Sequence, residues 1–79
     1  MRLPFYDFSV MEKKEVLLHL ANCLKELRKK KGVSQEFVND KTGVHIARIE
    51  HGSRDITFST LVKLADFFEV SLDYFDLDK

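Results

Sequence analysis

Three histidines and one cysteine are the side chains of this 79-residue sequence that could bind a metal or act as a nucleophile. His45 and His51 are six residues apart in one short segment, so on a helix they point in different directions, and no cysteine pair or carboxylate cluster completes a zinc site. Cys23 follows His19 by one helical turn, but a nucleophile also needs a pocket and an oxyanion site, which a plain helix does not offer. No glycine-rich phosphate loop is present. We therefore expect no metal, no cofactor and no enzymatic activity.

A second group of polar side chains lies in the segment "GVHIARIEHG", residues 43–52. Ile46 and Ile49 have the three-residue spacing of one helix face, and His45 and Arg48 are offset from them. A guanidinium can bond guanine bidentately, which gives about 1–3 kcal/mol of discrimination between bases. The segment is therefore either a helix that lies in a DNA groove or a short core helix with charges on its outer side.

The composition indicates one folded, helix-rich domain, with 44% hydrophobic and 33% charged residues. The net charge is zero, yet residues 1–54 carry 11 basic against 7 acidic side chains and residues 55–79 carry 2 against 6. Such a polarised chain can present a basic face to nucleic acid, although the acidic part is also consistent with a simple solvated surface. No apolar run approaches the ~20 residues of a membrane span and no secretory signal is visible, so we expect a cytoplasmic protein without membrane contact. The unpaired cysteine fits a reducing compartment.

The elements that must position these residues are all helical. Residues 1–9 form an aromatic arm, and residues 10–79 form the domain. Ser9 and Glu12 have capping-box spacing, which predicts the start of a long first helix that ends at Gly32. Ser34 caps a second helix from Gln35 to about Lys41, with Phe37 and Val38 as the inward candidates.

Three more helices complete the predicted bundle. Thr42 is expected to cap a third helix that starts at Gly43 or Val44, runs to about Glu50 and is stopped by Gly52. Thr57 caps a fourth helix, and Ser71 caps a short fifth one. The buried face of the fourth helix is expected to consist of Phe58, Leu61, Leu64, Ala65 and Phe68. The fold class is therefore all-α, a compact five-helix bundle.

Three segments in this order resemble the Cro/repressor-type (XRE-family) helix-turn-helix domain. They are "LKELRKKKGVSQE" (24–36), "IARIEHG" (46–52) and "STLVKLADFFEVSLDYF" (59–75). The resemblance covers about residues 17–76. It implies a lambda-repressor-like DNA-binding fold in which the second and third helices form the helix-turn-helix.

The resemblance also implies roles for single residues. Arg28 and Glu50 match a pair of residues that forms a structural ion pair between helices in the family. Gln35 matches the glutamine at the start of the second helix, which contacts the DNA backbone or a base. Ser53 and Arg54 lie where the family commonly grips the next phosphate.

The sequence departs from the family pattern between these segments. The stretch from Ser34 to Glu50 is three residues shorter than usual, and the loss lies between Val38 and His45. We expect the second helix to lose its last turn at residues 39–41, so that Thr42 caps the third helix directly. Arg48 is then the best base reader, and much of the affinity comes from phosphate contacts. The expected DNA-binding set is Gln35, Lys41, Thr42, Gly43, His45, Arg48, His51, Ser53 and Arg54.

Aromatic residues gather in the arm and near the C-terminus, where they either cover the chain's own helices or form a dimer interface. We expect a dimer, because the family often pairs two recognition helices about one DNA turn apart. The predicted function is a sequence-specific, double-stranded DNA-binding transcriptional regulator, expected to be a repressor. It would be of bacterial or phage origin, act on an inverted-repeat operator and be nucleoid-associated through DNA binding. The alternative is an antitoxin or another protein-interaction module with a partner protein and secondary promoter binding.

Overall fold

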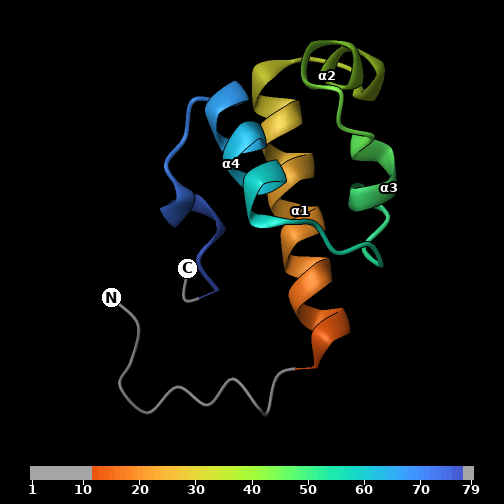
Figure 1. Ribbon diagram of the computed structural model, residues 1–79, viewed down its shortest axis with the longest axis vertical. Helices are drawn as coiled ribbons and strands as arrows, with labels where there is room; N and C mark the ends of the chain where they lie inside the picture. Colours follow the sequence, from red (N-terminus) through yellow and green to blue (C-terminus); the bar gives the residue numbers. More distant parts are fainter. Residues whose placement is uncertain (1–11, 78–79) are drawn as a thin grey trace.

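The computed structural model describes residues 12–77 of the chain, and these contain four α-helices, one 3-10 helix and no β-strand (Figure 1). The elements are α1 (Lys13–Lys31), α2 (Gln35–Thr42), α3 (Ile46–Glu50), α4 (Phe58–Phe67) and η2 (Leu72–Phe75). The all-α class is therefore confirmed, but the predicted fifth helix is only a 3-10 turn. The aromatic arm, residues 1–9, lies outside the described residues.

The first helix, α1, is the longest element and begins later than the sequence predicts. Its N-cap is Glu12, which forms a capping box with Glu15: the Glu12 backbone N–H donates to the Glu15 carboxylate at 3.1 Å. The prediction that Ser9 caps this helix is therefore wrong. The predicted end is confirmed, because Gly32 adopts the left-handed conformation with φ 73° and its N–H donates to the Arg28 carbonyl at 2.9 Å.

The turn between α2 and α3 differs from the prediction. α2 begins at the predicted cap, with the Ser34 hydroxyl accepting from the Phe37 N–H at 3.0 Å, but it continues to Thr42 and does not lose its last turn. Gly43 then ends α2 with φ 77°, so Thr42 does not cap α3. α3 starts only at Ile46, which makes it five residues long, about 7.5 Å at ~1.5 Å per residue. Residues 43–45 therefore form the connection, and the late start of α3 makes this helix short.

Thr42 forms other hydrogen bonds than those of the predicted N-cap of α3. Its hydroxyl donates to the Val38 carbonyl at 2.7 Å, and it accepts from the Val44 N–H at 3.0 Å. The first bond is internal to α2, and the second joins the end of α2 to the connecting segment. The Thr42 hydroxyl thus makes local bonds to the backbone at the end of α2 and not the predicted cap of α3.

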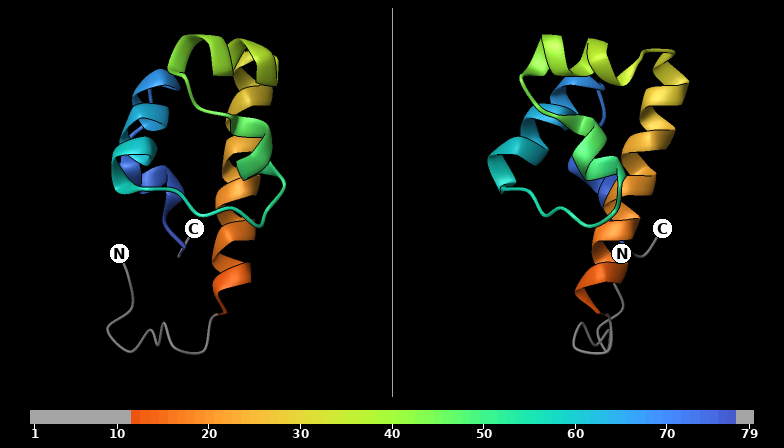
Figure 2. Two further views of the ribbon diagram at one scale, coloured as in Figure 1. Left: turned by 45° about the vertical axis from the view of Figure 1, so that its right-hand side comes forward. Right: turned by 90° about the vertical axis from the view of Figure 1, so that its right-hand side faces the viewer.

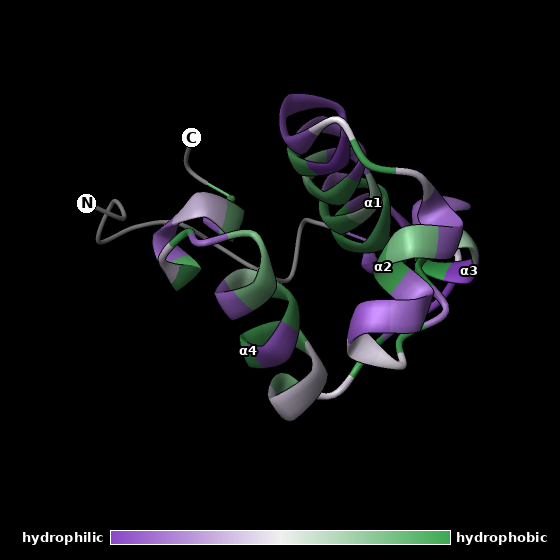
Figure 3. Cartoon of the chain, turned by 90° about the horizontal axis from the view of Figure 1, so that it is seen from above, coloured by the Kyte–Doolittle hydropathy of each residue, from purple (hydrophilic) through white to green (hydrophobic). Residues whose placement is uncertain are grey.

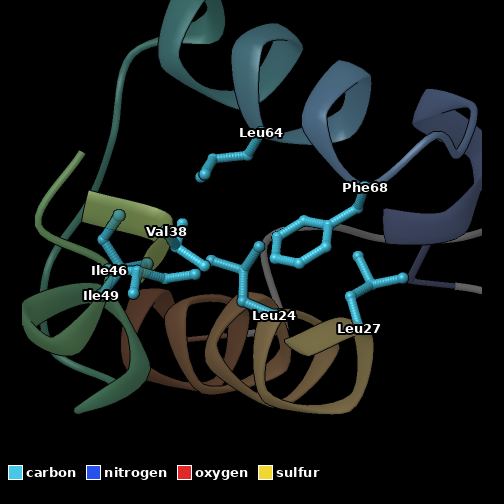
Figure 4. Packing of buried hydrophobic residues seen from close by; sticks show 7 residues of the cluster. All are labelled: Leu24, Leu27, Val38, Ile46, Ile49, Leu64 and Phe68. Atoms are coloured by element: carbon cyan, nitrogen blue, oxygen red, sulfur yellow. The ribbon is translucent and has the colours of Figure 1, made fainter. Parts of the chain in front are cut away.

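The helices enclose one core. α2 lies across one end of the molecule and α3 lies alongside α1, while α4 packs against α2 and η2 (Figures 1 and 2). Green hydrophobic and purple hydrophilic residues share each labelled helix, as amphipathic helices require (Figure 3). The core cluster comprises Leu24, Leu27, Val38, Ile46, Ile49, Leu64 and Phe68 (Figure 4).

Two aromatic residues predicted to be buried are exposed. Phe58 is the first residue of α4 and is 69% exposed, since the helix only reaches the core with Leu64 and Ala65. Phe37 on α2 is 40% exposed, while the adjacent Val38 is completely buried. The Thr57 cap of α4 is confirmed, with its hydroxyl accepting from the Thr60 N–H at 3.2 Å.

Candidate nucleic-acid interface

The two faces of α3 separate packing from exposed polar groups. Ile46 and Ile49 are buried against α1 and α2, as predicted, whereas His45 and Arg48 are exposed on the outer side. His45 is the N-cap of α3 and Arg48 lies within the helix, and the two side chains line the same surface depressions. The hydrophobic spacing of this short helix therefore fixes which polar residues point outward.

A partly buried ion pair anchors the end of α3. Arg28 donates from Nε to Glu50 Oε2 at 2.7 Å and from Nη2 to Glu50 Oε1 at 3.1 Å, and its Nη1 donates to the Val33 carbonyl at 3.1 Å. Glu50 is only 4% exposed, and hydrogen bonding to it raises the pKa of the Arg28 guanidinium. This bidentate pair joins α3 to the end of α1, and it is the pairing that the family resemblance implies.

Gln35 takes part in the same network. Its side-chain amide donates from Nε2 to Glu50 Oε1 at 2.9 Å. Gln35 can still offer DNA its side-chain amide oxygen and its own backbone N–H in the first turn of α2. Gln35 thereby links the start of α2 to the end of α3 and fixes how the two helices lie relative to each other.

Polar residues from three elements surround the outer side of α3. A shallow depression of about 280 Å³ between α2 and α3 is lined by Gln35, Glu36, Asn39, His45 and Arg48, among others. A second one, of about 500 Å³, extends from His45 and Arg48 to Arg54, Asp55, Thr57 and Thr60 at the start of α4. We call the continuous surface formed by Gln35, Asn39, His45, Arg48, Arg54 and Thr60 the α3 face.

The basic groups of the α3 face are not used by the fold. Within residues 12–77, the guanidinium groups of Arg48 and Arg54 make no hydrogen bond or ion pair, and both side chains are exposed. Two carboxylates, Glu36 and Asp55, line the same depressions. The face therefore offers two free guanidinium groups and a histidine beside acidic side chains.

The structure does not bring every predicted site residue to this face. Lys41 is on the α4 side of α2, with its ammonium group 5.4 Å from the centre of the Phe37 ring, and it lines a depression shared with Lys63, Asp66 and Phe67. Thr42 and Gly43 form the turn. His51 and Ser53 are exposed after the end of α3 and line neither depression.

Sequence reasoning missed Asn39 and Thr60 as members of the α3 face. Asn39 follows Gln35 by four residues, which places both on one side of α2, so this spacing was an available signal. Thr60 belongs to the first turn of α4, and only the path of the preceding loop brings it near Arg48.

The pair Cys23 and His19 has a structural role. His19 Nε2 lies 3.2 Å from the Phe75 carbonyl oxygen and 3.5 Å from Cys23 Sγ, and the Cys23 thiol donates to the Tyr74 carbonyl at 3.9 Å. Burial, followed by the nearby Glu26 carboxylate, raises the pKa of Cys23, which disfavours a nucleophilic thiolate. Both side chains thus attach η2 to α1. Among the described residues no group of three or more metal-ligating side chains occurs.

Two short helices joined by a tight turn, with the second one clamped to the core and its polar side outward, define a helix-turn-helix protein. A helix-turn-helix family model matches residues 24–75, which is most of the chain. The chain therefore belongs to the Cro/repressor-type (XRE) helix-turn-helix family, a family of DNA-binding transcription regulators. Neither a curated protein nor a solved structure gives a significant match. No helix in residues 12–77 has the length and apolar character needed to cross a membrane.

Proposed function

We propose that this protein is a sequence-specific regulator of transcription that binds double-stranded DNA through the α3 face. The observation that carries the proposal is the state of Arg48: its guanidinium is exposed, has no partner within the described residues and lies on the outer side of a clamped helix. A free guanidinium held in this way can bond a guanine edge in the major groove. Arg48 is therefore the proposed base reader, and His45 is its neighbour.

The remaining contacts in this proposal go mainly to phosphates. Arg54 extends the basic surface toward α4, and the start of α2 directs backbone N–H groups outward beside Gln35. Four further residues of the expected DNA-binding set flank this surface: Thr42, Gly43, His51 and Ser53. Lys41 would contact a phosphate from the far end of α2. With an α3 of only five residues, a large share of the affinity comes from this sequence-independent term.

The proposed active form is a cytoplasmic, nucleoid-associated dimer that represses by occupying an inverted repeat. Support comes from the family, in which two recognition helices commonly contact half-sites one helical turn apart. The C-terminal aromatic residues contribute less to a dimer surface than their number suggests, because Phe68 is buried and Phe67, Tyr74 and Phe75 pack against the chain's own core.

The test is a selection of bound duplexes from a random library at stated salt concentrations. The proposal predicts enrichment of a two-fold symmetric sequence whose half-sites are about 10 base pairs apart. Enrichment of a single half-site would contradict binding as a dimer, but it would still support sequence-specific DNA binding. No enrichment over the starting library would contradict sequence-specific binding itself.

A partner-protein function, such as that of an antitoxin, is the second candidate. It is favoured by the α2–α4 side, where the half-exposed Phe37 lies 6.4 Å from Phe67 and the ammonium groups of Lys31 and Lys41 lie over these two rings. Aromatic residues are enriched at protein–protein interfaces. Stoichiometric co-purification of a second small protein from native lysate, lost on Phe37→Ser, would favour this function. Purification without any partner would count against it.

A further inference from the structure

An apolar groove that the proposed DNA interface does not use lies between α1 and α4. It has a volume of about 410 Å³ and is lined by Val16, Leu20, Ile56, Phe58, Leu61 and Phe75, among others. Phe58 at its edge is 69% exposed, the largest value among the exposed large hydrophobic side chains of residues 12–77. An exposed phenyl ring beside an apolar groove is energetically unfavourable in water unless something covers it.

We propose that residues 3–8 of the same chain, "LPFYDF", bind in this α1–α4 groove. Five of these six residues are apolar or aromatic, the only acidic one being Asp7. Each buried aromatic side chain removes ~150–250 Å² from water. The segment thus offers the apolar and aromatic side chains that would cover the apolar lining of the groove.

The position of the segment in the chain favours this occupant. The described residues begin at Glu12, the N-cap of α1. From there Val16 lies about 6 Å and Leu20 about 12 Å along the helix axis, at ~1.5 Å per residue. The four residues from Glu12 back to Phe8 span up to ~13–14 Å when extended. Phe8 can therefore reach the groove, and Phe5, which is three residues farther from Glu12, can reach it as well.

The covalent link also favours the chain's own segment over any other occupant. A short tether gives the attached segment a local concentration on the order of millimolar, which a separate protein in dilute solution does not approach. A second copy could contribute the same six residues, but it would have to compete with this intramolecular segment. The groove shares no lining residue with the depression between α2 and α3. It does share Asp55, Ile56 and Thr57 with the second depression of the α3 face, so the test is made on the protein without DNA.

The experiment uses the full chain with Phe8→Trp, which introduces the only tryptophan. We expect blue-shifted emission and an acrylamide quenching constant several-fold lower than that of the urea-unfolded protein. Adding Phe58→Asp, at the edge of the groove, should restore the quenching of the unfolded protein. Val62→Asp is the matched control: Val62 is 41% exposed on the same helix but does not line the groove, so this change should leave the shielding intact. Circular dichroism checks that each variant keeps its helices.

An isotope-filtered nuclear Overhauser experiment on mixed labelled and unlabelled wild-type chains separates the two sources of the segment. Contacts between the Phe5 or Phe8 rings and the Val16 or Leu20 methyl groups within one molecule would support the proposal. The same contacts only between different molecules would overturn it in favour of a second copy. The proposal would also be overturned if the acrylamide quenching constant of the Phe8→Trp protein were as high as that of the urea-unfolded protein. It would equally be overturned if the low quenching constant survived Phe58→Asp.

Discussion

At the scale of single residues, Glu50 has the greatest influence on how the α3 face is presented. It is a nearly buried carboxylate that accepts hydrogen bonds from Arg28 on α1 and Gln35 on α2. A buried charge is tolerated only when it is paired, so this network holds three helices in one arrangement. The guanidinium of Arg48, two residues earlier, is exposed on the outer side of the helix that this network holds in place.

Removing one partner of this pair should be costly. Arg28→Ala leaves Glu50 buried with Gln35 alone, and we expect it to lower the free energy of unfolding by about 3–5 kcal/mol. Urea denaturation followed by circular dichroism measures the change. Lys29→Ala is the matched control, because Lys29 is the exposed neighbour with no side-chain partner among the described residues, and it should shift stability by less than ~0.5 kcal/mol. Equal losses in the two variants would contradict the structural role of the pair.

The two kinds of basic residue should differ in their effect on DNA binding. Arg48→Ala should relax base preference at one position per half-site, at a cost of about 1–3 kcal/mol for the preferred sequence. Arg54→Ala should weaken all sequences alike and reduce the slope of log affinity against log salt by about 1, whereas Lys41→Ala should change the slope less, because Lys41 lies on the α4 side of α2. Fluorescence anisotropy titrations at several salt concentrations measure both. Uniform loss from Arg48→Ala would remove Arg48 as a base reader.

At the scale of elements, the turn from α2 to α3 depends on one glycine. Gly43 has φ 77° as the C-cap of α2, and a β-carbon at this position would meet no atom within 4 Å. Gly43→Ala should therefore cost only the left-handed backbone penalty, about 1–2 kcal/mol, and Gly43→Asn should cost less. Thermal unfolding of the two variants tests this. An alanine variant as stable as the parent would show that the turn can adopt another conformation.

The attachment of η2 to α1 makes a prediction at high pH. The Tyr74 hydroxyl donates to Glu26 at 2.5 Å, and burial followed by this hydrogen bond raises the pKa of Tyr74 to about 12. Because this pKa is above the unfolded value of ~10, the stabilisation is fully present below pH ~10 and is lost as the pH rises toward 12. In a Tyr6→Phe background, tyrosinate absorbance should titrate near 12. Glu26→Gln should lower that midpoint, and an unchanged midpoint would contradict the role of the carboxylate.

Most of the elements could be predicted from local signals in the sequence. Ser34, Thr57 and Gly32 act as caps because a hydroxyl or a left-handed glycine satisfies the helix end within a few residues. The start of α3 could not be predicted in this way. Thr42 has the residue type of an N-cap, but its hydroxyl donates to the Val38 carbonyl and accepts from the Val44 N–H. Only the left-handed Gly43 decides between these uses.

The residues of the site were predictable only in part. Arg48 and His45 follow from the spacing of Ile46 and Ile49, which requires only that α3 is a helix. The position of Lys41 does not follow, because its side of α2 depends on how α2 packs against α4. Phe37 and Phe58 have the spacing of buried residues on their helices, but they are exposed because burial depends on how the helices pack.

At the scale of the whole molecule, the zero net charge conceals a division along the chain. Residues 1–54 contain the free guanidinium groups and carry a net charge of +4, while residues 55–79 carry −4. In the proposed complex, the basic N-terminal part would favour contact with a polyanion, and the zero net charge would keep non-specific attraction to DNA moderate. We therefore expect a specific complex that is strongly salt-dependent, as phosphate contacts require.

Chemical-shift mapping tests the central claim, that the outer side of α3 contacts the duplex, most directly. The isotope-labelled full chain is titrated with the duplex obtained by selection, and the amide signals are followed residue by residue. We predict the largest changes at residues 35, 45–48 and 53–54, with smaller ones around residue 60. Largest changes at Phe37 and Phe67, or along the α1–α4 groove, with residues 45–48 unaffected, would contradict this claim.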